Sequence, residues 1–202
     1  TAVTLQANND IILNSASDII ANNPSGNGGN LTLQAGRSVL INSNITTDNG
    51  NLTINANSTV ADGVVNAQRD AGAANLTIAP ASVLNAGTGS VNLAIKDGAG
   101  LTNNTAGVLS LNNVIAGQVS YLADNMTLTG GTSATGRVVL APTTANRGIW
   151  LGTADSPANL SLTDAELKTI TGASVLQVGN ASSGSINVKN VLTPNVSTLS
   201  LQ

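Results

Sequence analysis

Short stretches in which apolar and polar residues alternate recur along the whole chain. Residues 4–7 (TLQA) return 28 residues later as residues 32–35 (TLQA), and residues 12–15 (ILNS) return at the same distance as residues 40–43 (LINS). Alternation with a period of two is typical of a half-buried β-strand. The near-repetition of whole phrases at a fixed distance indicates a repeat architecture.

Further copies of the first phrase follow at unequal spacing. The phrase returns after 21 residues at 52–56 (LTINA) and after another 24 at 76–79 (LTIA). Looser copies lie at residues 91–93, 126–128, 160–162, 186–188 and 199–201. Gly, Asn and Asp separate the copies, and these residues favour turns because they tolerate positive φ angles.

This pattern predicts an all-β fold, a right-handed parallel β-helix (β-solenoid) of about ten coils. A β-sandwich could also contain many short strands, but it has no reason to repeat the same residue types at the same step of each strand. Parallel crossover connections are strongly biased to the right hand. We expect one coil to contain strands at 31–35, 39–43 and 45–47. We interpret residues 1–202 as a single β-solenoid segment of a longer chain.

Stacking of equivalent residues would explain the composition of the strands. We expect Val, Ile, Leu and Ala to fill a narrow interior, from which bulky aromatic side chains would be excluded. Two rows of stacked polar residues are also predicted. One is an amide ladder of Asn14, Asn42 and Asn85, and the other is an outward hydroxyl row of Thr4, Thr32, Thr53 and Thr77.

One segment departs from the strand pattern and predicts a short helix near residues 163–170. Thr163 and Glu166 have the spacing of a capping box, and Leu162 and Leu167 have that of a hydrophobic staple. Gly172 follows as an expected C-terminal stop. We expect this helix at a corner between coils.

The composition narrows the functional classes. Apolar residues make up 41% of the 202 residues and charged residues 8%, with a net charge of −3 and neither Cys nor His. No disulfide framework or thiolate metal site is available, and we expect no cofactor. We expect neither nucleic-acid binding nor membrane insertion, because no apolar run has the length of a membrane helix and the basic residues are scattered. They are Arg37, Arg69, Lys96, Arg137, Arg147, Lys168 and Lys189.

Several phrases resemble the repeats of filamentous haemagglutinin-type exoproteins. Residues 29–35 (GNLTLQA) and 39–43 (VLINS) carry the resemblance in the first half, and residues 160–167 (LSLTDAEL), 176–179 (LQVG) and 184–188 (GSINV) in the second. The resemblance implies a right-handed parallel β-helix. It also implies two-partner secretion through an outer-membrane transporter and service at the bacterial cell surface as an adhesin or long fibre. The expected function is a structural shaft, with weak lateral contacts to host-cell or surface glycans.

The strongest candidate for a ligand contact is Trp150. If Ile149 and Leu151 face the interior, alternation turns Trp150 outward, where it could stack on a sugar ring unless the 163–170 helix or a loop covers it. The alternative function is a carbohydrate-active β-helix that binds or cleaves polysaccharide. Such an enzyme would need convergent carboxylates, and the candidates are Asp62, Asp70, Asp124, Asp155, Asp164 and Glu166. Because Asp62, Asp164 and Glu166 suit turns or caps, we expect no enzymatic site. An ice-binding solenoid would need a flat threonine array, but the predicted row is one residue wide.

Ten Asn-x-Ser/Thr sequons provide candidate glycosylation sites. The alternative is that each is a turn Asn followed by a strand residue, which the repeat itself produces. They begin at Asn30, Asn44, Asn51, Asn57, Asn75, Asn103, Asn125, Asn159, Asn180 and Asn195.

Overall fold

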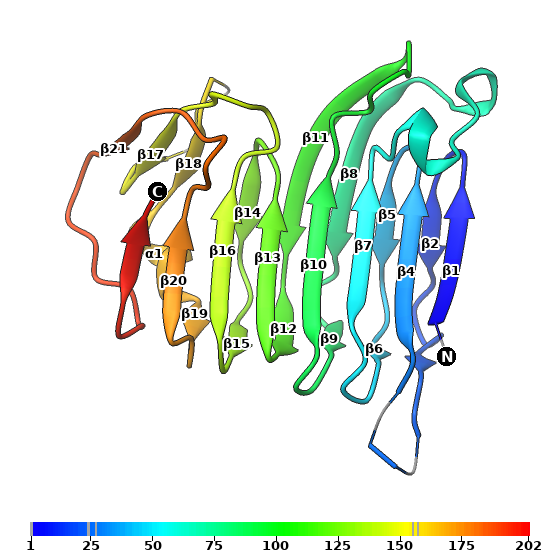
Figure 1. Ribbon diagram of the computed structural model, residues 1–202, viewed down its shortest axis with the longest axis horizontal. Coiled ribbons are helices and arrows are strands. Elements are labelled where there is room, and N and C mark those ends of the chain that lie inside the picture. Colours follow the sequence, from blue (N-terminus) through cyan, green and yellow to red (C-terminus); the bar gives the residue numbers. More distant parts are fainter. Residues whose placement is uncertain (1, 24, 27, 155, 157) are drawn as a thin grey trace.

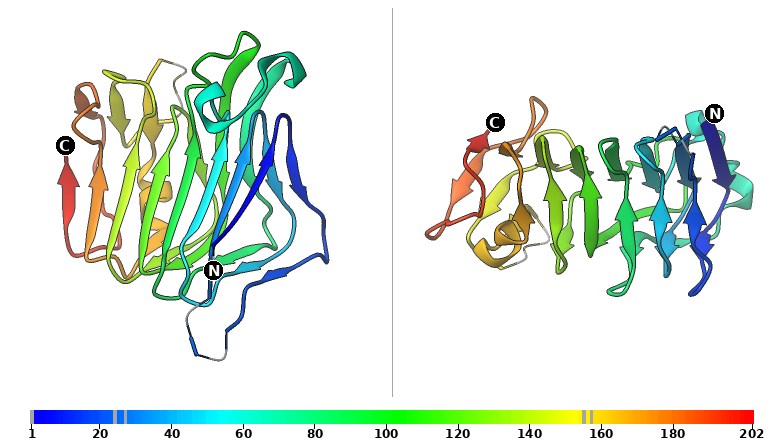
Figure 2. Two further views of the ribbon diagram at one scale, coloured as in Figure 1. Left: turned by 45° about the vertical axis from the view of Figure 1, so that its right-hand side comes forward. Right: turned by 90° about the horizontal axis from the view of Figure 1, so that it is seen from below.

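The computed structural model describes residues 2–23, 25–26, 28–154, 156 and 158–202. The protein is nearly all-β, and its named strands form parallel sheets that we call sheets A to D (Figure 1). Sheet A makes up one long face of the molecule, and the other sheets lie behind it (Figure 2). The all-β prediction is therefore confirmed.

The strands of sheet A lie side by side in the order in which they occur along the chain. In the described residues they are β1 (Ala2–Ala7), β4 (Asn30–Ala35), β7 (Leu52–Ala56), β10 (Ser90–Ile95), β13 (Gln118–Leu122), β16 (Arg137–Ala141), β20 (Val175–Val178) and β22 (Leu199–Leu201).

Sheets B and C run behind sheet A in the same direction along the molecule. Sheet B contains β2 (Ile11–Leu13), β5 (Val39–Ile41), β8 (Gly72–Ile78), β11 (Asn104–Leu111) and β14 (Met126–Leu128). Sheet C contains β3 (Ile19–Ile20), β6 (Ile45–Thr46), β9 (Val83–Asn85), β12 (Asn113–Ala116), β15 (Thr132–Ala134) and β19 (Ile170–Thr171). From β1 to β15 the chain visits A, B and C in turn, and we call each such passage a circuit.

The register of sheet A confirms the first two repeat distances. Val3 pairs with Leu31, which lies 28 residues later, and Leu31 pairs with Leu52, which lies 21 residues later. The strands expected at 31–35, 39–43 and 45–47 are present as β4, β5 and β6, although β5 and β6 end earlier than predicted.

The third repeat distance was wrong, and so was the last member of each predicted polar row. Thr4, Thr32 and Thr53 do lie side by side in sheet A. Leu76 pairs with Val39 in sheet B, so Thr77 lies beside Leu40 and not beside Thr53. Asn85 lies in sheet C beside Thr46, whereas β2 and β5, which precede Asn14 and Asn42, pair in sheet B. The phrase Leu-Thr-Ile suits any strand with one buried face, so its sequence does not determine which sheet it joins.

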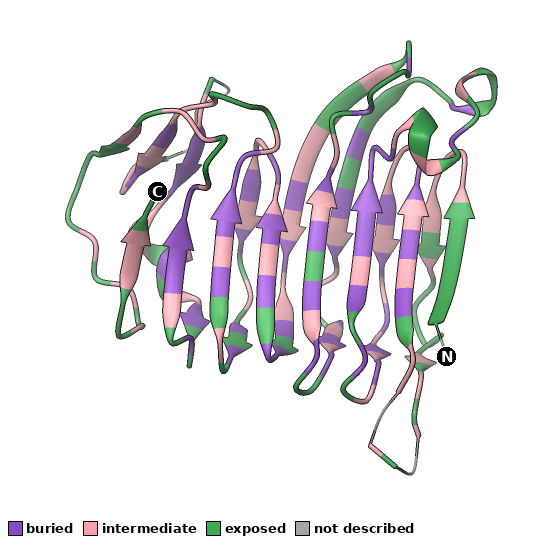
Figure 3. Ribbon diagram, in the orientation of Figure 1, coloured by how far each residue is buried: buried purple, intermediate pink, exposed green. Residues whose placement is uncertain are grey.

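Inward positions build a continuous aliphatic core. The burial of β4 alternates between outward residues and the buried Leu31, Leu33 and Ala35, and other sheet A strands alternate likewise (Figure 3). The expected exclusion of aromatic residues was wrong at Tyr121. This fully buried side chain lies between Leu93 and Leu140, and its hydroxyl oxygen is 2.8 Å from Thr132 Oγ1. A single ring therefore fits the interior because its polar end finds a partner.

Glycine allows close approach of circuits at the corner that leads into sheet A. A Cβ atom added to Gly89 would lie 2.5 Å from the carbonyl oxygen of Gly50, and one added to Gly50 would lie 2.4 Å from that of Gly29. Such separations are too short for a side chain, so this corner requires glycine in consecutive circuits.

Side-chain oxygens of corner Asn and Asp residues extend the hydrogen bonding between circuits beyond the strands. Asn30 Oδ1 accepts the N–H of Asn51, and Asn51 Oδ1 in turn accepts the N–H of Ser90, both at 2.9 Å. In sheet C, Asn44 Oδ1 accepts the N–H of Val83 at 3.0 Å. These bonds supply partners to backbone groups that would otherwise be left unpaired where the strands end.

Two excursions interrupt the regular circuits, so sheet A has eight strands in the described residues where about ten coils were expected. The first, between β7 and β8, contains the 3₁₀ helices η1 (Val60–Asp62) and η2 (Asn66–Gln68). The second contains sheet D strands β17 (Ile149–Leu151) and β18 (Leu160–Leu162) and helix α1 (Asp164–Lys168). Strand β17 pairs with β18 on one side and with the later β21 (Ile186–Val188) on the other.

Helix α1 confirms the predicted helix at a position between sheets D and C. Thr163 and Glu166 form the expected capping box, and Leu167 is buried. Gly172 is not the stop, however, because the helix ends at Lys168 and β19 intervenes.

Arg69 joins the first excursion to the neighbouring circuits. The residue is only 3% exposed, and burial lowers the pKa of its guanidinium. Its N–H groups donate to four backbone carbonyls and one side-chain amide. The acceptors are the carbonyl oxygens of Gly36, Asp70, Gly72 and Asn103 and the Oδ1 atom of Asn57. One planar side chain thus connects residues from several turns of the chain.

Replacing Ile54 by Ala should lower the free energy of unfolding by about 2–5 kcal/mol, because its fully buried side chain would leave a cavity. The adjacent Thr53 faces outward, so Thr53→Ala serves as the matched control with an expected change within about 0.5 kcal/mol. Urea unfolding of both variants tests the assignment of the two faces. Equal losses would contradict it.

Substitution of Arg69 by Lys should destabilise the first excursion, since an ammonium group cannot reach the separate acceptors of the guanidinium. Each buried acceptor left unpaired costs roughly 1–3 kcal/mol. Hydrogen exchange should accelerate at residues 57–71 in this variant. The control Arg137→Lys alters an exposed side chain that donates to Gln177 and should leave exchange there unchanged.

Candidate functional site

Trp150 lies on the outer face of sheet D, as the alternation predicts. Its neighbours Ile149 and Leu151 are fully buried, whereas Trp150 is half-buried. The ammonium nitrogen of Lys189 lies 4.7 Å from the centroid of the indole ring. This distance is within the range of a cation–π interaction, so a lysine covers part of the ring.

The cross-strand neighbours of Trp150 are polar. Trp150 pairs across the sheet with Ser161 on one side and Asn187 on the other. Ser161 is buried, and within the described chain its hydroxyl finds no hydrogen-bond partner. Helix α1, the expected cover, packs against β14 and β19. A ligand contact at Trp150 stays a prediction, and a ligand on the covered ring face would have to displace Lys189.

The candidate carboxylates are distributed over several parts of the fold. Asp62 lies in η1, Asp70 follows η2, Asp124 follows β13, and Asp164 and Glu166 lie in α1. Asp155 lies outside the described residues. Among the residues that the structure describes, no group of three or more His, Cys, Asp or Glu could hold a metal ion.

Asp62 is engaged in a local network between the first excursion and β10. Its carboxylate accepts hydrogen bonds from the backbone and hydroxyl of Thr59 and from Lys96 Nζ at 2.8 and 3.0 Å. Partial burial acts to raise the pKa of Asp62, but the bonds from Lys96 and Thr59 outweigh it and lower that pKa. A carboxylate held in its ionised form by such partners is unsuited to donate a proton.

Two other candidate carboxylates, Asp124 and Asp164, also bind nearby groups. Asp124 Oδ1 accepts the N–H groups of Thr143 and Thr144 at 3.0 and 2.8 Å. Asp164 Oδ2 lies 2.6 Å from Lys168 Nζ, and the hydrogen bond from this lysine lowers the pKa of Asp164. These contacts fix loops and the short helix.

The sequons are largely part of the corners. Asn57 is fully buried, with its Nδ2 atom donating to the carbonyl oxygen of Lys96 at 2.8 Å. Asn30, Asn44 and Asn51 accept N–H groups from the next circuit, as described above, and Asn75 Oδ1 does the same for Val108 at 2.9 Å. The structure therefore gives the asparagines at the strand ends the turn role that the repeat pattern favours, whereas Asn75 lies within strand β8.

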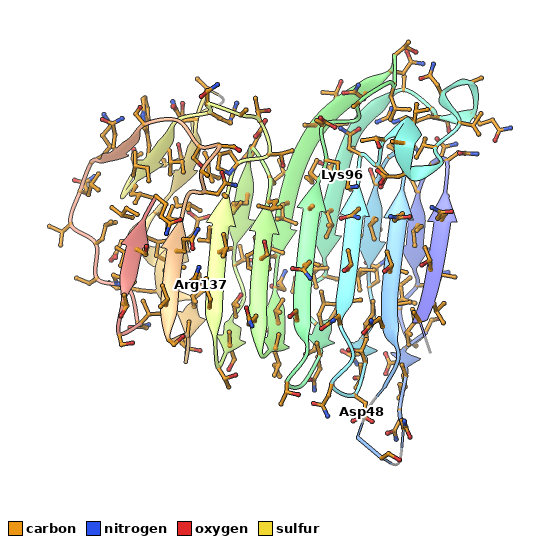
Figure 4. The ribbon with its side chains drawn as sticks, viewed as in Figure 1. Asp48, Lys96 and Arg137 are labelled. Carbon is orange, nitrogen blue, oxygen red and sulfur yellow. The ribbon has the colours of Figure 1, made fainter. Side chains whose placement is uncertain are left out.

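A groove over the outer face of sheet A was not predicted from the sequence. Its volume is about 330 Å³, its floor lies on β7, β10 and β13, and residues 142–143, 180 and 182 contribute to its walls. We call this the sheet A groove. Lys96, labelled in Figure 4, borders it with its ammonium directed to Asp62. Its lining comes from residues far apart in sequence, so no local motif marks it.

Comparisons with known proteins add no identification. No family model, curated protein or solved structure matches the chain. In the described part of the protein, no helix has the length and apolar character needed to cross a membrane.

Replacement of Lys189 by Gln should expose the indole ring of Trp150. The chain contains a single Trp, so its fluorescence reports this site directly. We expect stronger quenching by acrylamide and a loss of about 0.5–1 kcal/mol in unfolding free energy. Lys168→Gln, which removes a surface ion pair with Asp164, is the control. Unchanged quenching in the Lys189 variant would contradict the contact.

Proposed function

We propose that the chain is a right-handed parallel β-helix that serves as a structural shaft segment of a large secreted bacterial surface adhesin or fibre. The observation that carries this proposal is the uninterrupted parallel stacking of sheet A strands in chain order. The regular alternation among sheets A, B and C supports the β-helix, and the strong bias of parallel crossovers supports its right hand.

The resemblance to filamentous haemagglutinin-type repeats gives the proposal its biological setting. Two of the phrases that carry the resemblance coincide with β4 and β5, which stack in register on neighbouring circuits. From this family we propose export by an outer-membrane transporter, exposure at the bacterial cell surface and weak lateral contacts with host-cell or surface glycans.

A mechanical role agrees with the interactions that hold successive circuits together. Force along the stack acts on many backbone hydrogen bonds between successive circuits, and corner bonds such as those of Asn30 and Asn51 add to them. The aliphatic core continues through the stack and distributes the packing energy along it. These features support a stiff element whose role is to extend or present other parts of a protein.

A carbohydrate-active enzyme is the weaker proposal. The carboxylates of Asp62, Asp124 and Asp164 bind local donors, and they come from separate elements. Acid–base cleavage of a glycosidic bond requires two carboxyl groups on opposite sides of one bond. We therefore propose no catalytic residues.

Immunogold microscopy of the cells that produce the protein tests the shaft. Antibodies against this segment should label intact cells outside the outer membrane, and disruption of the partner transporter should remove this label while the protein remains inside. A labelled cell interior with no surface label in the undisturbed cells would overturn the proposal. So would polysaccharide cleavage by the purified protein that is lost on replacement of one of these carboxylates.

A further inference from the structure

The sheet A groove contains an amide side chain that has no hydrogen-bond partner among the described residues. Asn55 is 8% exposed, and its side chain makes no hydrogen bond to any described residue, although the side chain lines the groove. Asn92, which is exposed on the next strand, likewise has a side-chain amide without a partner in the described chain. Each amide can donate and accept hydrogen bonds, so the groove offers donors and acceptors to a bound molecule.

The charge of the groove indicates a neutral ligand. Among the described lining residues, Lys96 is the one with an ionic side chain, and its ammonium is paired with Asp62. No unpaired charge therefore faces a ligand. Anionic or cationic molecules would lose hydration without gaining a counter-ion.

The remaining lining favours a molecule with hydroxyl groups around an apolar face. Asn55 pairs across the sheet with Ala94, and Ala94 pairs with Leu122, so apolar side chains continue the row that begins at this amide. Pro142 adds an apolar contribution to the wall. A saccharide unit matches both parts, because each hydroxyl both donates and accepts while the ring carbons present C–H groups.

The groove is held in shape without a ligand. Thr143 Oγ1 donates to the carbonyl oxygen of Ile95 at 2.7 Å, and Asp124 fixes the N–H of the same threonine. In the second wall, Asn180 Oδ1 accepts the N–H of Ser182 at 2.9 Å. Pre-formed walls reduce the entropy lost when a ligand binds.

A peptide fits this position less well than a sugar. Extended peptides gain affinity by adding a strand to an open sheet edge. The floor strands β7, β10 and β13 each pair with a neighbour on both sides, so they present a face and no edge. The available contacts are side-chain amides and apolar atoms.

We propose that the sheet A groove binds one unit of a neutral saccharide, with the Asn55 amide as its main polar contact. This site lies on sheet A, whereas Trp150 lies on sheet D. The inference assigns a site to the proposed lateral contacts with glycans, and as an explanation of those contacts it rests on the proposed function. The groove and its chemistry are the same whether or not the protein is a surface shaft.

Titration followed by nuclear magnetic resonance tests the proposal on the whole chain. The probes are neutral hexoses, N-acetylhexosamines and short oligosaccharides of each. At least one should shift the side-chain amide signals of Asn55 and Asn92 together with backbone signals at 142–143 and 180–182. Asn55→Leu should weaken this binding about tenfold. Its melting temperature should be unchanged or higher, because the amide that is removed has no partner in the protein.

Asn103→Leu is the matched control, since this exposed side chain also lacks a partner among the described residues and does not line the groove. It should bind the saccharide as the original protein does. Absence of any shift with all probes, equal affinity of the Asn55 variant, or response to extended peptides in place of saccharides would each overturn the proposal. Cell-surface labelling is scored separately, so failure of the groove and failure of the shaft are distinguishable.

Discussion

Parallel hydrogen bonding between equivalent strands constrains almost every other property of this protein. In sheet A each residue lies directly beside its counterpart in the next strand, as Leu31 does with Leu52 and Leu52 with Val91. Inward positions therefore stay apolar from circuit to circuit, with Tyr121 as the aromatic exception, because a slip by one residue would turn the whole apolar set outward. The same constraint removes space for Cβ atoms at Gly50 and Gly89, where the backbones of consecutive circuits meet.

The connections between strands are free from this constraint and differ widely in length. The chain inserts η1 and η2 between β7 and β8, and inserts β17, β18 and α1 between β16 and β19, while sheet A keeps its register. Each insertion makes its own hydrogen bonds to the rest of the fold. Arg69 of the first insertion donates to backbone carbonyls, and Glu166 Oε1 of the second accepts the N–H of Leu128 at 3.2 Å. Variation in the length of the chain between strands is thus confined to corners and loops. Residues from these loops also form the walls of the sheet A groove.

Sequence periodicity was sufficient to predict the pairing of β1, β4 and β7, because the phrases of these strands are nearly identical. It failed at Leu76, where a matching phrase joins sheet B, since alternation specifies one buried face and does not specify which sheet supplies it. The outward direction of Trp150 followed from local alternation, whereas the lysine above it did not. Asn55 could not be recognised because its surroundings depend on residues more than a hundred positions later in the chain.

The sequential stacking of sheet A makes the protein a one-dimensional series of coupled units. Each inner strand of the described sheet contacts one predecessor and one successor, whereas β1 and β22 each contact a single neighbour. Opening an inner circuit between two intact neighbours breaks two interfaces, but opening one whose neighbour is already open breaks only one. Loss of structure therefore spreads most easily from a circuit that is already open to the circuit beside it.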